Sequence, residues 1–389
     1  MDKKSGYILI LSLMLVSVAV TLITSVVQRA ISYQRQARLV LDREKARTLA
    51  LGGIEIARAQ LALIIPKEQK NGPAQSAYAG SLPQSNQSSK PEDKTKEEEA
   101  KQPPQQRWFG QLVTLINAWQ QFSLTDKADG IDGIVQLHIS SEQGKLAINQ
   151  LLPLMQPKPA AQNKPTPNGA PGAKPATPTN PPNAQAQETN KPLAVVLNEL
   201  LAPAVGNGQF FASVEQLKKQ LGRGFEDATE LLQAKDMQTA FQEKITLMPG
   251  KKPDKQTVYL TDLFTIHSGS GRINPWFISN SFGSLLGFTQ KEGPRDTKEW
   301  VKNFKPFMQW QSVWDKLLMP TFGKSYASLP KEITALFSLQ FEATAFFVLS
   351  YGTVGGITQK VAALLEKDTV PAELSPQSVI FKITKLYWL

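Results

Sequence analysis

The amino-acid sequence predicts an α+β protein in which a long N-terminal helix packs on a β-sheet head. Three observations support this fold class. Tyr7–Val27 carries no charge, and apolar residues continue at helical spacing through Gln28–Ile65. Residues 135–139 alternate apolar and polar side chains, which is typical of a half-buried strand. Residues 193–247 have a helical composition, which predicts an all-α subdomain inserted into the head.

The N-terminal segment is long enough to cross a membrane. As a helix rising ~1.5 Å per residue, Tyr7–Val27 spans about 31 Å, close to the hydrocarbon thickness of a bilayer. This run is longer than the apolar core of a secretory signal peptide, and no A-x-A cleavage pattern follows it. We therefore expect the segment to remain as an anchor, continued by a stem helix over residues 28–65.

The flanking charges give no single orientation for this anchor. Lys3 and Lys4 precede it, whereas five arginines follow it, partly offset by Asp42 and Glu44. These arginines are Arg29, Arg35, Arg38, Arg43 and Arg47. A plain positive-inside count therefore favours an N-terminus outside the cytoplasm.

Two segments have the composition of disordered linkers. Residues 66–107 are mostly Lys, Glu, Gln, Ser and Pro, and residues 157–192 hold ten prolines with no Val, Ile, Leu, Met or aromatic residue. Neither segment can bury enough apolar surface to offset the entropy of ordering its chain. Both are predicted to be linkers or surface loops.

The first part of the head, residues 108–156, is predicted to contain a helix and a β-hairpin. Apolar residues over Trp108–Phe122 share one helical face. The strand at residues 135–139 is followed by a turn at Ser141–Lys145, with a positive φ expected at Gly144, and Leu146–Ile148 would return as the second strand.

The inserted subdomain, residues 193–290, is predicted to be helical. Ser213, with Gln216 three residues later, forms a capping-box pattern that would start a helix at Val214, and Gly222 and Gly224 would end it. Asp227–Leu232 would begin another helix.

The remaining segment, residues 291–389, is predicted to return to the sheet. Thr334–Ser350 is dense in Phe, Leu and Thr, and alternation at Val379–Ile383 indicates an edge strand. Together with a leader over residues 1–6, the predicted order is leader, membrane helix, stem, linker, head, insert, helical subdomain and final strands.

Composition narrows the classes of function. The chain has 389 residues, a formal net charge of +10, no Cys and two His. Without Cys there are no disulfides, thiol chemistry or Cys-ligated zinc. The two histidines are far apart in sequence, and no phosphate-binding Gly-Lys-Ser/Thr loop or G-x-S-x-G motif is present, so no enzyme activity and no cofactor are predicted. The acids of Asp126–Gly133 do not have EF-hand spacing, but a calcium site built with other loops stays open.

Three sequence blocks, in this order, resemble the minor pseudopilin K family of type II secretion systems (general secretion pathway protein K). The first is the N-terminal block through Arg43–Arg58, the second is Ser141–Asn149, and the third is Gly271–Asn274. The second block is similar to the family's D-E-Q-G-K hairpin and the third to its G-x-I-N element. The residues that carry these two motifs are Glu142, Gln143, Gly144, Lys145, Asn149, Gly271, Arg272, Ile273 and Asn274.

The resemblance implies a pilin-like fold with a helix-hairpin-helix-like (SAM-like) subdomain, and a place at the tip of the pseudopilus. A prepilin peptidase would cut after Gly6, making Tyr7 the first mature residue. Leu11 then occupies the fifth position, where most pilin-like subunits carry a Glu that neutralises the terminal amine of the subunit above. A tip subunit has nothing above it, and an unpaired carboxylate in an apolar bundle would be costly. The implied partners are I-like and J-like minor pseudopilins, with the N-terminus in the cytoplasm, the anchor in the inner membrane and the head in the periplasm.

Two other functions stay open. A minor pilin of a type IV pilus, similar to the PilX group, would share the N-terminal block. Residues 211–225 also resemble one helix-hairpin-helix unit, which in DNA-binding proteins presents backbone N–H groups to phosphate. Because the usual L-P-G-I-G hairpin is absent here, nucleic acid is not an expected partner.

Overall fold

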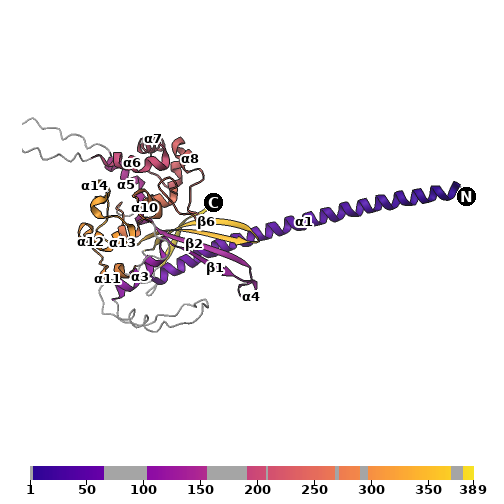
Figure 1. Ribbon diagram of the computed structural model, residues 1–389, viewed down its shortest axis with the longest axis horizontal. Coiled ribbons are helices and arrows are strands. Elements are labelled where there is room, and N and C mark those ends of the chain that lie inside the picture. The colour runs from indigo at the N-terminus through magenta and orange to yellow at the C-terminus, as the bar shows by residue number, and fades with distance from the viewer. Residues whose placement is uncertain are drawn as a thin grey trace, which may run out of the picture. The chain divides into compact units, whose positions relative to one another are not determined.

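The computed structural model describes residues 3–64, 103–155, 191–206, 209–267, 271–289, 297–368 and 380–389 (Figure 1). It confirms the α+β class. The chain forms two compact units. The sheet unit comprises Met1–Leu63, Trp119–Ile139 and Phe347–Leu389, and the helical unit comprises Ile64–Ala118 and Ser140–Phe346. Most of the two predicted linkers, residues 66–102 and 157–190, lies outside the described residues.

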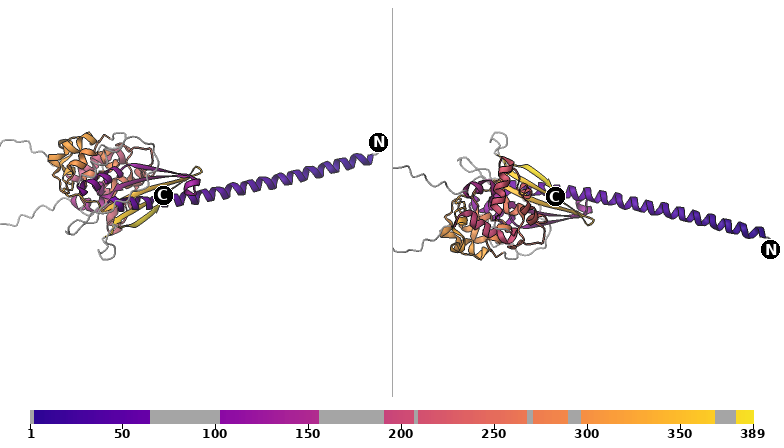
Figure 2. Two further views of the ribbon diagram at one scale, coloured as in Figure 1. Left: turned by 90° about the horizontal axis from the view of Figure 1, so that it is seen from below. Right: turned by 90° about the horizontal axis from the view of Figure 1, so that it is seen from above.

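The sheet unit consists of one long helix and a five-stranded sheet. Helix α1, Lys3–Ile64, runs without a break in all views (Figure 2). The strands lie in the order β1-β2-β5-β6-β7, with antiparallel pairing between β1 and β2 and between β6 and β7. Their bounds are β1 Trp119–Leu124, β2 Gly133–Ser141, β5 Ala345–Val354, β6 Ile357–Lys367 and β7 Phe381–Trp388. A short helix α4, Asp126–Asp129, joins β1 to β2.

Small residues let α1 lie close against the sheet. Its buried face repeats at helical spacing through Ala46, Ala50, Ile54, Ala57 and Leu61. On the sheet side, a Cβ built on Gly352 of β5 would overlap the backbone of Ala46 and Ala50. The C-terminal half of α1 is therefore a packed core helix.

A two-residue turn joins β5 and β6. Gly355 and Gly356 have φ angles of 56° and 84°, which is the left-handed region that a tight I′ hairpin requires at both positions. The confirmed edge strand β7 pairs with the other side of β6, with a bulge between Leu364 and Leu365. Val379, predicted to belong to this strand, lies outside the described residues.

The helical unit contains short helices around an aromatic core. Trp276, Trp300, Trp314 and Phe109 are fully buried, and Trp276 makes edge or tilted contacts with Phe109 and Trp300 at centroid distances of 5.0 and 5.3 Å. Its elements are α3 Pro104–Leu115, η1 Glu142–Gly144, β3 Leu146–Ala147, α5 Ile148–Met155, α6 Leu193–Val205, α7 Phe210–Leu221, η2 Ala228–Gln233, α8 Lys235–Phe241, α9 Leu260–Leu263, β4 Phe264–Thr265, η3 Pro275–Phe277, α10 Asn280–Leu285, α11 Lys298–Asn303, α12 Trp310–Leu317, α13 Met319–Phe322, η4 Tyr326–Ser328 and α14 Lys331–Thr334.

The predicted helix at Trp108–Phe122 is wrong at both ends. Helix α3 begins at Pro104, inside the segment assigned to the first linker, because proline is well tolerated in a first helical turn. The helix ends at Leu115, and Asn117 then adopts a φ of 59°. Trp119–Leu124 pairs with β2 as β1 instead, so tertiary pairing overrides a helical apolar spacing.

The predicted hairpin is also wrong. Strand β2 pairs with β1 rather than with the residues that follow it, and Leu146–Ala147 forms a two-residue parallel pair with β4. Ile148 already begins helix α5. Gly144 does not have a positive φ. Glycine is required there for a different reason, because a Cβ would overlap the backbone carbonyl of Phe277.

The helical subdomain is confirmed as helical, with different bounds. Helix α7 begins at Phe210 rather than at Val214, so Ser213 lies within the helix and its hydroxyl donates to Asp236 (3.3 Å). Gly222 ends α7, as predicted, and it adopts a φ of 65° in the left-handed region. Helices α11–α14 and the chain up to Phe346 belong to the same compact unit. The predicted boundary at residue 290 lies outside the described residues.

Candidate functional site

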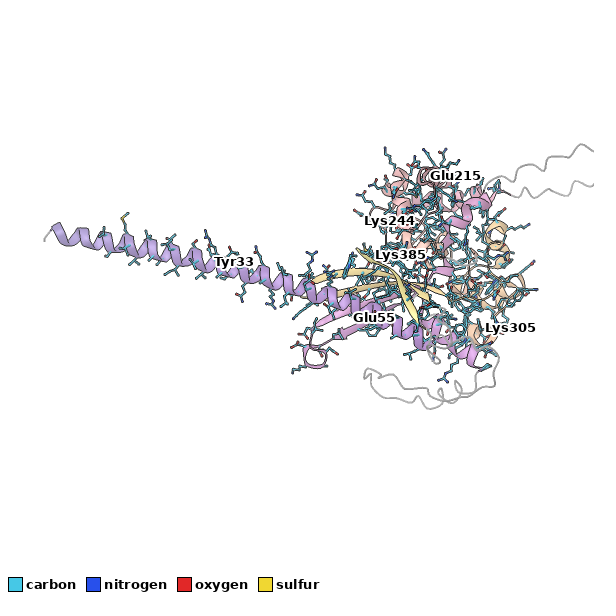
Figure 3. The ribbon with its side chains drawn as sticks, turned by 180° about the vertical axis from the view of Figure 1, so that it is seen from behind. Tyr33, Glu55, Glu215, Lys244, Lys305 and Lys385 are labelled. Atoms are coloured by element: carbon cyan, nitrogen blue, oxygen red, sulfur yellow. The ribbon has the colours of Figure 1, made fainter. Side chains whose placement is uncertain are left out.

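The N-terminal half of α1 is an exposed apolar helix. Every described side chain from Leu11 to Leu41 is exposed, including large apolar ones such as Leu13 and Val26. Length and composition make this helix a candidate membrane span. Tyr33 lies on the part of α1 that extends beyond the sheet (Figure 3). A helix with such a surface requires an apolar environment, either lipid or partner helices.

The residues predicted for processing lie at the start of this helix. The backbone of Gly6 and Tyr7 belongs to α1, whereas the side chain of Tyr7 lies outside the described residues. Leu11 has an exposed fraction of 55%. Its side chain is therefore available to a neighbouring helix or to lipid.

The structure brings the two predicted family motifs together, although about 130 residues separate them in sequence. The N–H of Asn274 donates to the carbonyl oxygen of Gln143 at 2.7 Å, and the N–H of Ser279 donates to that of Gly144 at 3.1 Å. The close approach at Gly144 permits these backbone bonds, because any side chain there would occupy the position of the Phe277 carbonyl. Both motifs thus lie in one backbone-to-backbone contact within the helical unit.

A buried ion pair lies at the centre of this contact. Lys145 Nζ lies 2.5 Å from Glu142 Oε1, and the exposed fractions of the two side chains are 0% and 4%. The other carboxylate oxygen of Glu142 accepts a hydrogen bond from the Thr265 hydroxyl of β4. The pair therefore links the η1 turn to the strand that pairs with β3.

A second buried carboxylate, Asp262, accompanies the pair. Its Oδ2 accepts from the N–H of Ser281 at 2.7 Å, while its Oδ1 has no hydrogen-bond partner among the described residues. Burial raises the pKa of the Asp262 carboxyl above its ordinary value, and the positive charge of Lys145 opposes this shift only in part. Asp262 and Thr265 were not predicted from sequence, since no spacing pattern connects them to Glu142.

Two amide side chains fasten neighbouring segments to the same region. In the orientation that satisfies both ends of its amide, Gln143 donates to the Ala345 carbonyl oxygen (3.2 Å) and accepts from the Ala345 N–H (3.3 Å). Asn149 likewise accepts from the N–H of Phe225 (2.9 Å) and donates to its carbonyl oxygen (2.8 Å). Each amide thus pairs with both the backbone N–H and the backbone carbonyl oxygen of one residue, as a neighbouring strand would.

The Gly271–Asn274 motif also forms hydrogen bonds to other backbone segments. Gly271 has a φ of 69°, and the N–H of Ile273 donates to the Leu336 carbonyl oxygen at 2.9 Å. The Asn274 amide accepts from the N–H of Trp276 (3.2 Å) and donates to the Glu342 carbonyl oxygen (3.2 Å). Arg272 is exposed. Gly271 is half-buried, whereas Ile273 and Asn274 are buried in contacts within the protein.

The Asp126–Gly133 segment uses its acids as backbone acceptors. Asp129 accepts from the N–H of Thr125 (2.9 Å), and Asp132 accepts from the N–H of Asp126 (2.7 Å). Within the described ranges, no group of three or more His, Cys, Asp or Glu side chains is placed to hold a metal ion. A calcium site built with other loops stays an open alternative.

The hairpin that resembles a helix-hairpin-helix unit holds matched charges. Arg223 pairs with Glu230 at 2.9 Å and with Glu226 at 3.6 Å. An adjacent pocket of about 480 Å³ is lined in part by Lys219, which pairs with Glu215 at 3.2 Å. These carboxylates compete with any phosphate for the same cations.

No model of a known protein family matches the chain, and no curated protein matches it in sequence. Among solved structures, it is similar to a chain in the crystal structure of the GspK–GspI–GspJ complex from the type 2 secretion system of enterotoxigenic Escherichia coli. The likeness is distant. It covers 76% of this chain and 99% of that chain, with 12% identical residues and a TM-score of 0.31. The function must therefore be argued from the chain's own residues.

Proposed function

We propose that this protein is a minor pseudopilin of a type II secretion system, which initiates or caps the pseudopilus tip during protein export. The observation that carries this proposal is the division of α1 into two halves. Residues 11–41 are exposed and largely apolar, whereas the face from Ala46 to Leu61 packs on a sheet. One continuous helix thus joins an exposed, largely apolar segment, the rod (residues 11–41), to a folded head.

The sequence order of the motifs supports the K-like member rather than another pseudopilin. Leu11, where a carboxylate would pair with the amine of a subunit above, suits a subunit with nothing above it. A leucine there also avoids placing an unpaired charge in an apolar bundle. The proposed partners are I-like and J-like minor pseudopilins, which would pack along the exposed rod.

In this proposal, the N-terminus lies in the cytoplasm and the head in the periplasm. A prepilin peptidase removes residues 1–6, and Tyr7 becomes the first residue. We infer a structural role for the buried motif, because its contacts hold segments of the helical unit in register.

The processing step gives the first test. Mass analysis of the chain expressed with a prepilin peptidase should find a mature N-terminus at Tyr7, and a Gly6→Ala variant should keep its leader. Ser5→Ala is the matched control, since it leaves the residue before the cut unchanged. A wild-type chain that still carries Lys3 and Lys4 would contradict the proposal.

Partner packing gives the second test. A photo-crosslinking residue at position 23, on the exposed rod, should capture I-like or J-like pseudopilins when these are coexpressed, whereas the same residue at exposed position 305 of the helical unit should not. Equal capture at both positions would contradict packing along the rod.

A further inference from the structure

We propose that Arg29, Arg35 and Arg38 form a binding site for anionic phospholipid headgroups just beyond the membrane-spanning segment. The proposal rests on the membrane insertion of α1 that the proposed function includes, but not on secretion or on any protein partner. It assigns a ligand class to the three exposed arginines of α1 that follow the uncharged segment.

No acidic residue precedes these three arginines in α1, and Asp42, one turn after Arg38, makes no ion pair with it in the described part of the chain. The sequence contains no Asp or Glu from Lys3 to Leu41. All three side chains are exposed, and none of them makes an ion pair within the described part of the chain. Farther along, Arg47 differs: it lies 4.0 Å from Glu44 and 4.4 Å from the Trp388 ring centroid. Cations without internal partners are those best able to bind an external anion.

Their depth fits the headgroup layer. At ~1.5 Å per residue, Arg29, Arg35 and Arg38 lie about 3, 12 and 17 Å beyond Val27. The headgroup region adds about 5–8 Å on each side of the hydrocarbon, and attraction to anionic lipid decays over a Debye length of about 8 Å. Long arginine side chains can also reach back toward the surface. Arg43 and Arg47, about 24 and 30 Å beyond Val27, lie outside this range.

Their arrangement around the helix favours lipid over a partner helix. At 100° per residue, Arg29 and Arg38 lie on opposite sides of α1, and Arg35 lies about 60° from Arg38. A single partner helix contacts one side only, whereas headgroups surround an inserted helix. Tyr33, exposed between the arginines, is a residue type enriched at membrane interfaces.

The site also accounts for the unusual charge distribution around the anchor. Positive residues after the segment oppose the orientation with the N-terminus in the cytoplasm. Anionic headgroups on the far side would compensate for these charges once the helix has inserted. The arginines would then hold the head at a fixed height above the membrane before assembly.

Native mass spectrometry of the full chain released from nanodiscs of mixed phosphatidylcholine and phosphatidylglycerol tests the proposal. The wild type should retain phosphatidylglycerol preferentially. R29Q should lower the ratio of retained phosphatidylglycerol to phosphatidylcholine roughly fivefold. R35Q and R38Q should lower it less, because these arginines lie farther from the hydrocarbon, and R29Q/R35Q/R38Q should lower it roughly tenfold or more. R29K/R35K/R38K should keep most of the preference, because the attraction is one of charge.

The matched control is K302Q/K305Q/K316Q, which removes three exposed positive charges from the helical unit. It should leave the lipid ratio unchanged. An unchanged ratio in R29Q/R35Q/R38Q, or an equal loss in the control, would overturn the site. Washing native membranes with alkaline carbonate separates the two proposals: release of the wild type overturns membrane insertion and the site together, whereas a retained chain without lipid preference overturns the site alone.

Discussion

Lys145 and Glu142 form an ion pair that is removed from water, with Nζ and Oε1 2.5 Å apart and the lysine side chain fully buried. Two buried charges lose hydration energy, and their attraction offsets this loss only when geometry is good and the remaining lone pairs are satisfied. The Thr265 hydroxyl satisfies the second oxygen of Glu142. We expect the pair to contribute specificity, because it links the η1 turn to the strand that contains Thr265.

Removing one partner of this pair should be strongly destabilising. Glu142→Gln keeps the shape of the side chain but leaves the Lys145 ammonium without its ion-pair partner. We expect a loss of about 3–5 kcal/mol in the free energy of unfolding. Denaturant unfolding of the full chain in detergent, followed by tryptophan fluorescence, measures this loss, because four tryptophans of the helical unit are buried.

Glu215→Gln is the control for this change. Glu215 Oε1 lies 3.2 Å from Lys219 Nζ, but the Glu215 side chain is 40% exposed and the Lys219 side chain 74% exposed. An exposed pair of this kind contributes about 0.5 kcal/mol or less. Equal losses in the two variants would show that burial of the Lys145–Glu142 pair has no energetic consequence.

The contact of Gly144 with Phe277 leads to a second prediction. Gly144→Ala places a methyl group where the Phe277 carbonyl lies, so the backbone bond from Ser279 to Gly144 must lengthen or break. We expect a loss of at least about 1–3 kcal/mol, measured by the same unfolding experiment. A variant as stable as the wild type would mean that η1 and η3 do not approach as closely as described.

The secondary-structure elements predicted correctly are those whose conformation is determined by residues close in sequence. The long helix α1 has an uncharged apolar run followed by apolar residues at helical spacing, and α7 ends at Gly222, which has a positive φ. In both cases neighbouring residues determine the conformation. The edge strand β7 also follows from the alternation of its own side chains.

The secondary-structure predictions that proved wrong concern residues whose conformation depends on partners distant in sequence. Trp119 occupies a helical position relative to Leu115, yet it lies in β1 because residues 119–124 find a pairing strand in β2. Leu146–Ala147 has the composition of a strand, but its partner β4 lies more than 110 residues away in sequence. No pattern within a short window distinguishes such a parallel pair from a hairpin.

The motif residues were predicted by resemblance, whereas their environment required the structure. Glu142 and Lys145 were assigned as a motif without a role, and their burial gives them a structural one. Asp262 could not be predicted at all, because a single acid in an apolar sequence carries no spacing signal. The expected positive φ at Gly144 was wrong, although a glycine is needed there.

Two adjacent glycines in α1 give a third, internally controlled prediction. A Cβ on Gly53 would overlap Ser350 Oγ and lie 2.9 Å from Val135, whereas a Cβ on Gly52 would meet nothing within 4 Å. Gly53→Ala should therefore cost about 1–3 kcal/mol by separating α1 from the sheet. Gly52→Ala should be neutral or stabilise the helix by up to about 1 kcal/mol. Thermal unfolding of both variants tests this, and similar melting temperatures would contradict the described packing of α1.

The buried Asp262 carboxyl gives a fourth prediction, on the pH dependence of stability. Because burial raises the pKa of Asp262 above 3.8, the folded state keeps this proton at pH values where the unfolded chain has lost it. The free energy of unfolding should therefore contain a component that falls as the pH rises from 3.8 through the raised pKa. Asp262→Asn retains an oxygen for the Ser281 N–H and cannot ionise, so it should remove this component and gain stability relative to the wild type as the pH rises.

Asp254→Asn should show the opposite sign, because backbone hydrogen bonds from Gln256 and Thr257 lower the pKa of Asp254, and its contribution is lost as the pH falls. Unfolding curves of the three chains across this pH range decide the question, and parallel curves for the wild type and Asp262→Asn would show that Asp262 titrates as it does in water.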